Sequence, residues 1–461
     1  MQPLVKEQTQ QPRNGNFAAG AVVVIGLGVT GLSVARHLHA RGEVVIVMDT
    51  RDNPPGLAIL RQELPQIRVV LGAFDGKLLR NAARVILSPG VALSEPAVRA
   101  ALDAGVEVAG DIELFVREAA APIAAITGSN GKSTVTAMLG DMARLDGRAV
   151  RVGGNLGEPA LALLEGDAAE LYVLELSSFQ LDTTWSLAAD VAAVLNISAD
   201  HLDRYTDFAH YSASKARILN GARTAVMNFD DPQLALLPFD GARRLGFSIC
   251  GNPHAVALLS SINGEDWLRL HGENIIRAAD VALVGKHNLA NALAAMLMAS
   301  ELGISTRAMR RALREFTGLA HRCALVANFA EVRWIDDSKG TNVGSTVAAI
   351  EGLQQGRNLV LIAGGLAKGQ DFAPLIAPIE RHVHTVVLIG KDAVVIDRIV
   401  PPCVNRVYAQ SIEDAVRAAA AAAGRGDTVL LSPACASMDM FVDYVARGNA
   451  FCDAVRELIQ K

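Results

Sequence analysis

The chain has 461 residues, too many for one ordinary hydrophobic core, and this length predicts about three domains. Its 43 basic residues nearly balance its 48 acidic residues, and the net charge of −5 provides no basic field for nucleic acid. The five cysteines are scattered without a CxxC spacing. This distribution fits neither a disulfide framework nor a zinc site, and it favours a reducing cytoplasm.

The composition of the N-terminal segment predicts neither a signal peptide nor a membrane span. Residues 1–16 are polar and lack the apolar core of a signal peptide, so we expect a disordered tail. The longest apolar run, residues 21–35, is short for a membrane span and is broken by three glycines. We therefore expect a cytoplasmic protein with no membrane partner.

The first block of the chain predicts strands at residues 21–25, 44–48 and 85–87, with a helix at 30–41. Gly26, Gly28 and Gly31 form a GxGxxG pattern directly after the first strand, and Asp49 ends the second. This is the fingerprint of a dinucleotide site, which suggests NAD. The geometry, however, requires only a diphosphate at a helix N-terminus, and a UDP-sugar supplies one equally well.

A second turn in this block, Ser88-Pro89-Gly90, follows the strand at 85–87. It offers further backbone donors at the same edge of the sheet. A plain β-turn also explains it, because Pro-Gly favours a turn without any ligand.

The second block predicts strands at 123–126, 172–176, 191–195 and 224–227. Its first strand runs into the sequence TGSNGKST and then into a helix, the order of a phosphate-binding loop. Backbone N–H groups of 128–132 would face nucleotide phosphates, Lys132 would reach the β and γ oxygens, and a hydroxyl of Ser133 or Thr134 would bind Mg²⁺. Ile126 replaces the first glycine of the usual pattern, so the loop is a shortened variant. The alternative is a glycine-rich turn with an incidental lysine.

Polar side chains end two further strands of this block. Glu175 ends an otherwise apolar strand, and its carboxylate is a candidate Mg²⁺ ligand. His201 lies between Asp200 and Asp203 in a polar run after the strand at 191–195. A lone histidine is more often structural, but these flanking carboxylates favour a role in the site. Lys215, on the helix that follows, would by default be a solvated surface lysine.

The third block predicts strands at 332–335, 359–363, 386–389 and 428–431, and a helix over the alanine run 418–423. We place domain boundaries near residues 110 and 317, which gives a tail at 1–16 and domains at 17–110, 111–317 and 318–461. The fold class is α/β. We expect a Rossmann-like first domain, a central parallel-sheet domain of the P-loop ATPase type, and a Rossmann-like third domain.

Several motifs together resemble the Mur ligase family, whose members are ATP-dependent amide-bond-forming enzymes of peptidoglycan synthesis. They are TGSNGKST, GGNLG at 153–157, LELSSFQL, DHLDRY and Lys215. Further segments are most similar to the family members that add D-glutamate to UDP-N-acetylmuramoyl-L-alanine. These are VIGLGVTGLS, MDTR at 48–51, GLAHR at 318–322, DSKGTN at 337–342 and LSPACASMDMF at 431–441. The resemblance covers nearly the whole chain.

The resemblance implies that a substrate carboxylate attacks the γ-phosphate of ATP to give an acyl phosphate, which the amine of D-glutamate then displaces. Lys132 and two Mg²⁺ ions would hold the anions in line. By similarity, Glu175 and Ser133 or Thr134 bind the first ion, His201 binds the second, and Asn155 positions the reacting groups. Lys215 matches a position that carries a carbamate, which would make it an anionic metal ligand instead of a repelling cation.

The resemblance also assigns the remaining binding residues, with Lys339 meeting the transferred phosphate. ATP contacts extend to Gly128, Ser129, Asn130, Gly131, His287, Asn288, Asn291, Arg322 and Asp337. D-glutamate would bind at Thr341, Lys368, Ser437 and Tyr444, and the UDP-sugar at Gly28, Val29, Thr30, Asp49, Thr50, Arg51, Ser88 and Gly90. Helix capping would also explain Asn288, and plain packing would explain Tyr444.

Other functions stay open on the sequence alone. One is another amino-acid-adding Mur-type ligase or a folylpolyglutamate synthetase, because side-chain specificity depends on few residues of the last domain. A dehydrogenase using NAD rests on GxGxxG and Asp49, and a non-catalytic nucleotide-dependent scaffold is a third class. For the ligase we expect a monomer whose domains close around the substrates to exclude water from the acyl phosphate.

Overall fold

The computed structural model describes residues 20–200, 204–238, 241, 243–283, 285–353 and 356–460. The predicted tail at 1–16 and His201 lie outside these residues. The chain forms two compact units. One contains the residues up to 118 together with Pro159–Glu165, and the other contains Ala119–Glu158 and Gly166–Lys461. In the described residues no helix is both long enough and apolar enough to cross a membrane.

The first unit is built on a five-stranded parallel sheet of order β3-β2-β1-β4-β5. Its strands are β1 Val22–Ile25, β2 Val45–Asp49, β3 Arg68–Leu71, β4 Arg84–Leu87 and β5 Glu107–Ala109. The helices are α1 Val29–Ala40, α2 Leu57–Glu63, α3 Gly76–Arg80, α4 Pro96–Asp103 and α5 Asp111–Val116. The three central strands, β2, β1 and β4, are largely buried and mostly apolar, as expected for a parallel sheet covered on both faces.

A segment from much later in the chain completes this unit. The 3-10 turn η1 (Ala160–Leu164) contacts α1 and α5, although the residues on either side of 159–165 belong to the other unit. Its Leu161 and Leu163 are fully buried. The core of the first unit therefore includes side chains that follow β7 of the central sheet.

The second unit contains a nine-stranded sheet of order β14-β13-β12-β11-β10-β9-β6-β8-β7, parallel except for the antiparallel pairs β12–β13 and β13–β14. The strands are β6 Ile123–Thr127, β7 Val150–Gly154, β8 Leu171–Glu175, β9 Val191–Val194, β10 Thr224–Asn228, β11 Arg243–Ser248, β12 Ala257–Ile262, β13 Glu265–Leu270 and β14 Glu273–Arg277. The helical segments are α6 Lys132–Leu145, α7 Ser178–Asp182, α8 Phe208–Ala216, η2 Arg217–Leu219, α9 Pro232–Ala235, η3 Ala278–Asp280, α10 Lys286–Glu301 and α11 Thr306–Glu315.

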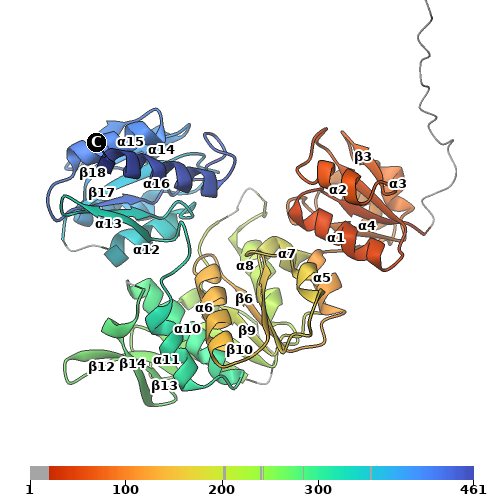
Figure 1. Cartoon of the computed structure of the whole chain (residues 1–461), viewed down its shortest axis with the longest axis horizontal. Helices are drawn as coiled ribbons and strands as arrows, with labels where there is room; N and C mark the ends of the chain where they lie inside the picture. Colours follow the sequence, from red (N-terminus) through yellow and green to blue (C-terminus); the bar gives the residue numbers. More distant parts are fainter. Residues whose placement is uncertain are drawn as a thin grey trace, which may run out of the picture. The chain divides into compact units, whose positions relative to one another are not determined.

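Helices cover both faces of the central part of this sheet. α6, α10 and α11 share one apolar core with alternate residues of β6, β8 and β9, while α7 and α8 lie on the other side (Figure 1). From β6 the chain passes to β7 at the edge, returns through β8, and then places β9 on the opposite side of β6. The carboxyl end of β6 thus lies where the connections diverge, the usual location of a ligand crevice in an open α/β sheet.

A six-stranded sheet of order β15-β16-β20-β17-β18-β19 completes the second unit, and only the pair β15–β16 is antiparallel. The strands are β15 Ala324–Phe329, β16 Val332–Asp336, β17 Leu359–Gly364, β18 Val383–Ile389, β19 Asn405–Tyr408 and β20 Thr428–Leu431. The helical segments are α12 Val343–Leu353, η4 Ala373–Leu375, α13 Ile376–His382, α14 Ala393–Asp397, α15 Ile412–Ala422 and α16 Tyr444–Gln460.

Strand β17 shows why this sheet is sandwiched between helices. Leu359, Leu361 and Ala363 pack in the core formed with α12, α13 and α14, while Val360 and Ile362 pack in the core formed with α15 and α16. Successive side chains of a strand point to opposite faces, so both sets are buried.

The predicted α/β class is confirmed, with three sheets dominated by parallel pairs. Every predicted strand is present, and the largest shift is in β18, which begins at Val383 instead of residue 386. The prediction omitted β3, β5, β7, β11 to β15 and β19, which are mostly short or partly exposed strands without a long apolar run. The boundaries near 110 and 317 stay predictions.

Candidate active site

Residues 128–134, called loop 128–134 below, comprise the turn after β6 and the first three residues of α6. Gly128 and Gly131 have φ angles of +156° and +83°, and Gly131 immediately precedes the helix. A Cβ atom on Gly131 would lie 2.4 Å from Oδ1 of Asn291, so only glycine fits this turn. The loop therefore brings backbone N–H groups to the N-terminus of a 14-residue helix, an arrangement that suits an anion.

Two lysines converge on this loop. Nζ of Lys132 donates hydrogen bonds to the carbonyl oxygens of Gly128 (2.9 Å) and Ser129 (3.0 Å), and Nζ of Lys215, from α8, donates to the same Gly128 oxygen (2.8 Å). Burial lowers the pKa of Lys132, although the charge of Glu175 opposes this. Burial, and then the charge of Lys132, lowers the pKa of Lys215 well below its usual value. Lys215 is thus buried beside the loop, and the default expectation of a solvated surface lysine is wrong.

Glu175 lies at the end of β8, beside the first turn of α6. Its Oε2 accepts a hydrogen bond from Oγ of Ser133, and its Oε1 accepts one from Nδ2 of Asn155 (2.6 Å). Burial favours the neutral acid, but the charge of Lys132 and the hydrogen bond from Ser133 outweigh it and hold the pKa of Glu175 below its usual value. The site therefore contains a buried carboxylate anion next to a hydroxyl.

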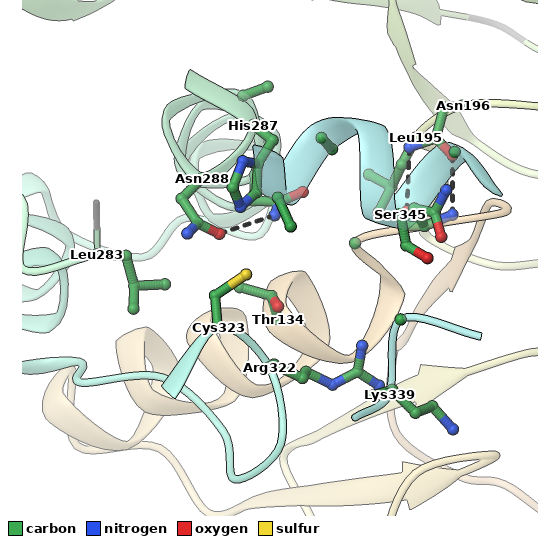
Figure 2. A pocket seen from close by; sticks show the side chains of 18 of the residues that line it. Thr134, Leu195, Asn196, Leu283, His287, Asn288, Arg322, Cys323, Lys339 and Ser345 are labelled. Carbon is green, nitrogen blue, oxygen red and sulfur yellow. Dashed lines mark hydrogen bonds between the residues drawn. The ribbon is translucent and has the colours of Figure 1, made fainter. Parts of the chain in front are cut away.

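A cavity of about 410 Å³ lies next to the loop. Figure 2 shows His287 and Asn288 of α10, Thr134 of α6, and Arg322 and Lys339 around it. The sequence-predicted residues that line it are Asn130, Gly131, Thr134, His287, Asn288, Asn291, Arg322, Asp337 and Lys339. It does not include Lys132, Ser133, Asn155, Glu175, Lys215, Thr341, Lys368, Ser437 or Tyr444 among its lining residues.

The residues that line the cavity from beyond α11 in the sequence include charged side chains. The guanidinium of Arg322 donates a hydrogen bond to Oγ of Ser133. Asp337 follows β16, and burial raises its pKa to about 7 against the hydrogen bond from Ser432 and the charge of Arg322. Burial, and then the charge of Arg322, lowers the pKa of Lys339 to about 8.

Lys339 and Tyr444 lie close together. Nζ of Lys339 lies 3.8 Å from the centre of the Tyr444 ring, a cation–π geometry. Tyr444 is the first residue of α16 and is only partly buried. Apolar packing is therefore not its whole environment, because its ring also contacts the charged end of Lys339. Of the other predicted D-glutamate residues, Ser437 is buried, Thr341 and Lys368 are partly buried, and Lys368 has a φ of +52°.

The glycine pattern of the first unit forms a tight turn between β1 and α1. A Cβ on Gly31 would lie 1.8 Å from the carbonyl oxygen of Gly26, whereas one on Gly28 would meet nothing within 4 Å. Ser88 closes the turn from the end of β4 by donating to the Gly26 oxygen (3.0 Å). Val29, at the start of α1, has 71% of its surface exposed. Thr30 lies beside it on the same helix turn, and Gly90 follows Ser88.

Asp49 supports this turn from the end of β2. Its carboxylate accepts hydrogen bonds from the backbone N–H of Leu27 (2.7 Å) and from the backbone and guanidinium of Arg51. Burial raises the pKa of Asp49, but these hydrogen bonds outweigh it and lower the pKa to about 2. Arg51 and Thr50 are exposed. Asp49 is thus an anion that holds the turn, in addition to any role toward a ligand.

The start of α10 excludes helix capping as the explanation of Asn288. The residue that caps the helix is Gly285, and Asn288 is the third helical residue, so the capping explanation of Asn288 is wrong. Asn288 instead accepts a hydrogen bond from Asn291 (3.3 Å). Burial lowers the pKa of His287 to about 4. His287 therefore stays neutral at physiological pH.

The oxygen donors around Ser133 fit a divalent cation. The Ser133 hydroxyl and the Glu175 carboxylate are hard ligands, the type that Mg²⁺ prefers, and they are already in contact. Thr134 lines the cavity instead. In the described part of the chain no three His, Cys, Asp or Glu side chains cluster as metal ligands, and the predicted ligand His201 lies outside that part. Any ion here would therefore complete its coordination with phosphate oxygens or water.

Sequence reasoning assigned no individual role to several residues that line the cavity. They are Leu195, Asn196, Leu283, Leu319, Cys323 and Ser345, among others. Asn196 and Cys323 were detectable in principle, because one follows a predicted strand and the other follows Arg322. The apolar leucines carry no signal that separates a cavity wall from an ordinary core.

Three family profiles match the chain in succession. The description "Mur ligase MurD-like, N-terminal domain" matches residues 20–110, "Mur ligase middle domain" matches 126–299, and "Mur ligase, glutamate ligase domain" matches 321–435. Together these matches extend over most of the chain.

Curated relatives are similar over nearly their whole length. The UDP-N-acetylmuramoylalanine--D-glutamate ligase of Nitrosococcus oceani is 50% identical over 442 residues, which cover 96% of this chain and 97% of that protein. The enzyme of the same name from Methylobacillus flagellatus is 48% identical, with coverage of 95% and 97%.

Solved structures share the fold. A pseudomurein peptide ligase type C from Methanothermus fervidus has a TM-score of 0.62 at 19% identity, covering 95% of this chain and 100% of that one. UDP-N-acetylmuramate-alanine ligase MurC from Thermotoga maritima has a TM-score of 0.61 at 18% identity, covering 95% and 99%. At this level of identity the likeness concerns the fold alone.

Proposed function

The chain belongs to the Mur ligase family, and from that premise we propose that it is an ATP-dependent ligase that adds D-glutamate to UDP-N-acetylmuramoyl-L-alanine. The observation that carries this function is the 50% identity, over 442 residues, to a curated ligase with that activity in its name. The product of such a ligase is a precursor of peptidoglycan, so the enzyme acts in cell wall synthesis.

The reaction activates one carboxylate and then couples it to an amine. The alanine carboxylate attacks the γ-phosphorus of ATP, ADP leaves, and an acyl phosphate forms. The amine of D-glutamate then attacks the acyl carbon, and the tetrahedral intermediate releases phosphate. The first step brings a carboxylate against a triphosphate, so cationic groups must hold the anions in line.

The chain supplies these cations from both sheets of the second unit. Lys132 begins α6, Arg322 contacts Ser133 of the same helix turn, and Lys339 lines the cavity. Asn155, hydrogen-bonded to Glu175, positions the reacting phosphate and carboxylate. We assign the adenine to the side of the cavity at His287, Asn288 and Asn291, where neutral side chains can pair with a base.

ATP-dependent ligases of this kind use Mg²⁺, and we assign two ions. Ser133 or Thr134 would hold the first together with Glu175, and the Ser133 to Glu175 contact favours Ser133. A bound ion supplies positive charge to the phosphate oxygens. His201 and a carbamate on Lys215 would hold the second. The buried Lys215 supports this assignment, because carbamate formation needs a neutral amine and its pKa is well below the usual value.

The other two substrates would bind on the outer parts of the chain. The turn between β1 and α1, with Gly28, Val29 and Thr30, would receive the diphosphate of the sugar nucleotide at a helix N-terminus. Asp49, Thr50 and Arg51 would contact the uracil and the sugar, together with Ser88 and Gly90. D-glutamate, a dicarboxylate, would bind at Thr341, Lys368, Ser437 and Tyr444, where a cation and hydroxyls are available.

We also propose that the central domain is of the P-loop ATPase type and that the two other domains are Rossmann-like, with limits at 17–110, 111–317 and 318–461. The enzyme would act as a monomer in the cytoplasm. A ligase that hands over an acyl phosphate needs a site closed to water. We therefore infer that the substrates bind with domain closure, and small-angle scattering with a non-hydrolysable ATP analogue and the UDP substrate would measure the compaction.

The test of the function is phosphate release from ATP with Mg²⁺ and UDP-N-acetylmuramoyl-L-alanine. D-glutamate is compared with L-glutamate, L-alanine and meso-diaminopimelate as the amine. We expect release only with D-glutamate. Release with another amino acid would assign a different Mur-type ligase, and no release with any of them would refute the proposal.

A further inference from the structure

Asn342, the residue immediately before α12, makes hydrogen bonds in three directions. Its Oδ1 accepts from the backbone N–H of Ser345 (2.8 Å), its Nδ2 donates to Oδ1 of Asn130 (3.2 Å), and the same Nδ2 donates to Oδ2 of Asp200 (3.0 Å). The residue is 5% exposed. A buried amide with one accepted and two donated hydrogen bonds has little freedom to rotate.

The orientation of this amide follows from its surroundings. Ser345 lies three residues beyond Asn342, so the Oδ1 contact is the hydrogen bond of a helix N-cap. Since a backbone N–H can only donate, the oxygen must face α12, and the NH₂ group must face Asn130 and Asp200. The cap of α12 thus fixes which group is presented to the loop.

Asn130 and Asp200, the two residues that accept hydrogen bonds from Asn342, follow strands β6 and β9 of the central sheet. Asn130 lies in loop 128–134, and its backbone is held by Asn196, whose Oδ1 accepts from Asn130 N (2.8 Å) and whose Nδ2 donates to Asn130 O (3.0 Å). Asp200 follows β9. The backbone of Asn130 is therefore fixed from β9, while its side chain is fixed from α12.

Gly344 permits this close approach. A Cβ at this position would lie 3.2 Å from Nδ2 of Asn130 and 3.2 Å from Oγ of Ser198, so a larger residue would crowd both side chains. The first turn of α12 thus fits against two segments that end neighbouring strands, β6 and β9.

We propose that Asn342 is a positioning residue for phosphoryl transfer, because its NH₂ group couples α12 to loop 128–134 and to Asp200. This inference rests on the proposed ligase function and goes beyond it. With α12 seated, the amide holds Asn130 and Asp200 at a fixed separation, and the loop is shaped for the triphosphate. Asn342 touches neither substrate nor reacting atoms in this role and acts through Asn130.

Asn342→Asp separates this role from helix capping. Aspartate is as good an N-cap as asparagine, so α12 keeps its cap. The carboxylate cannot donate to Asn130 or Asp200, and it places a like charge against Asp200. Asn358→Asp is the matched control, because Asn358 precedes β17 at the opposite end of the strands and donates a 3.3 Å hydrogen bond to the carbonyl oxygen of Gly426, away from loop 128–134.

The first measurement compares kinetics and melting temperature. We expect Asn342→Asp to lower kcat/KM for ATP by about tenfold or more, as for a lost charge-assisted hydrogen bond, while Tm stays near that of Asn358→Asp. Asn358→Asp should keep wild-type kinetics. Equal kinetics in the two variants, or a fall in Tm that accounts for the loss, would overturn the proposal and leave Asn342 as a helix cap only.

The second measurement does not depend on turnover. With Mg²⁺ and a non-hydrolysable ATP analogue, hydrogen–deuterium exchange of peptides covering loop 128–134 should be faster in Asn342→Asp than in the wild type. Unchanged exchange would overturn the proposal. If the wild type lacked D-glutamate-dependent turnover, the proposed function would fail, but this comparison would still decide the role of Asn342.

A double-variant cycle tests the partner directly. In Asn342→Asp with Asp200→Asn the donor and acceptor are exchanged, so a hydrogen bond can re-form in the reverse direction without charge repulsion. We expect the double variant to lose less kcat/KM than the product of the two single losses. Strict multiplication of the losses would show that the two residues are not coupled.

Discussion

Lys215 and Gly128 are joined by a 2.8 Å hydrogen bond from Nζ to the carbonyl oxygen, which ties a buried amine of α8 to the end of β6. Only 2% of Lys215 is exposed, and burial lowers its pKa well below the usual value. A lysine in this state is poised to lose its proton. The neutral amine is the form that reacts with CO₂, so the carbamate predicted from the sequence is chemically accessible here.

We predict that Lys215 carries a carbamate at neutral pH. Enzyme in CO₂-depleted buffer should lose activity and regain it when bicarbonate is added. Protein incubated with ¹³C-bicarbonate should show a carbamate resonance by NMR. Lys215→Arg keeps a positive charge but cannot be carbamylated, so it should lack this resonance and lose turnover by on the order of a hundredfold or more. An identical spectrum for the two proteins would contradict the prediction.

We predict that Glu175→Gln weakens the response to Mg²⁺ without unfolding the protein. The amide keeps the shape of the carboxylate, and its single oxygen can still accept one of the two hydrogen bonds, from Ser133 or from Asn155. It lacks the anionic charge that a hard cation prefers. The Mg²⁺ concentration for half-maximal turnover should rise by about tenfold or more, with kcat also reduced.

The control for this variant is Thr136→Val. Thr136 is a buried residue of α6, and its hydroxyl has no hydrogen-bond partner in the described structure. Valine has nearly the same shape, so this change should leave the Mg²⁺ dependence and Tm close to wild type. A parallel loss in both variants would indicate a general disturbance of the helix.

We predict that Lys339 contributes a fall in kcat/KM as pH rises through about 8. Burial, and then the charge of Arg322, lowers its pKa from 10.5 to about 8, so the free enzyme loses this cation above that pH. Arginine stays charged, so Lys339→Arg should have lower activity overall but no decline near pH 8. A pH–rate profile of each protein measures this. The same decline in both would assign it to another group.

The same shift in pKa has a consequence for stability. Between pH 8 and 10.5 the unfolded chain binds more protons at this residue than the folded chain does. The contribution of Lys339 to the free energy of unfolding should therefore rise with pH across this window, and its burial is most unfavourable below pH 8.

We predict that two glycines of the first unit respond differently to alanine. Gly28→Ala introduces a methyl group that meets nothing within 4 Å, so Tm should be unchanged. If the diphosphate binds at this turn, the methyl group blocks it, and KM for the UDP substrate should rise by about tenfold with KM for ATP unchanged. An unchanged KM for the UDP substrate would place the diphosphate elsewhere.

Gly31→Ala is the structural counterpart. Its Cβ would lie 1.8 Å from the Gly26 carbonyl oxygen, so α1 must move and Tm should fall. The free energy of unfolding should drop by about 1–3 kcal/mol, the cost of overpacking a tight contact, as measured by chemical denaturation.

The sequence predicted most of the fold because buried parallel strands are continuous apolar runs. Strand β6 and loop 128–134 show this most clearly, since an apolar run, a glycine turn and a helix follow one another without interruption. The hairpin β12–β13 was missed because its strands mix exposed and buried residues and lack a long apolar run. Strand periodicity is weak in such segments.

Site residues that belong to a continuous sequence motif were predictable. Site residues whose role depends on contacts between distant segments were less so. Lys132 is evident from its own loop. Asn342 is not, because its role depends on Asn130 and Asp200, which are far away in sequence and come together only through the pairing of β6 with β9 and the packing of α12. Motif spacing carries no information on such pairs.

The turn η1 determines when the first unit can complete its fold during synthesis of the chain. Leu161 and Leu163 are buried in a turn that contacts α1 and α5, yet they are translated after the first two strands of the central sheet. A ribosome that adds roughly 5–20 residues per second has already released the five strands of the first sheet before these leucines emerge. For several seconds the nascent N-terminal unit must therefore keep an apolar surface exposed, and a chain interrupted between residues 118 and 159 could never cover it.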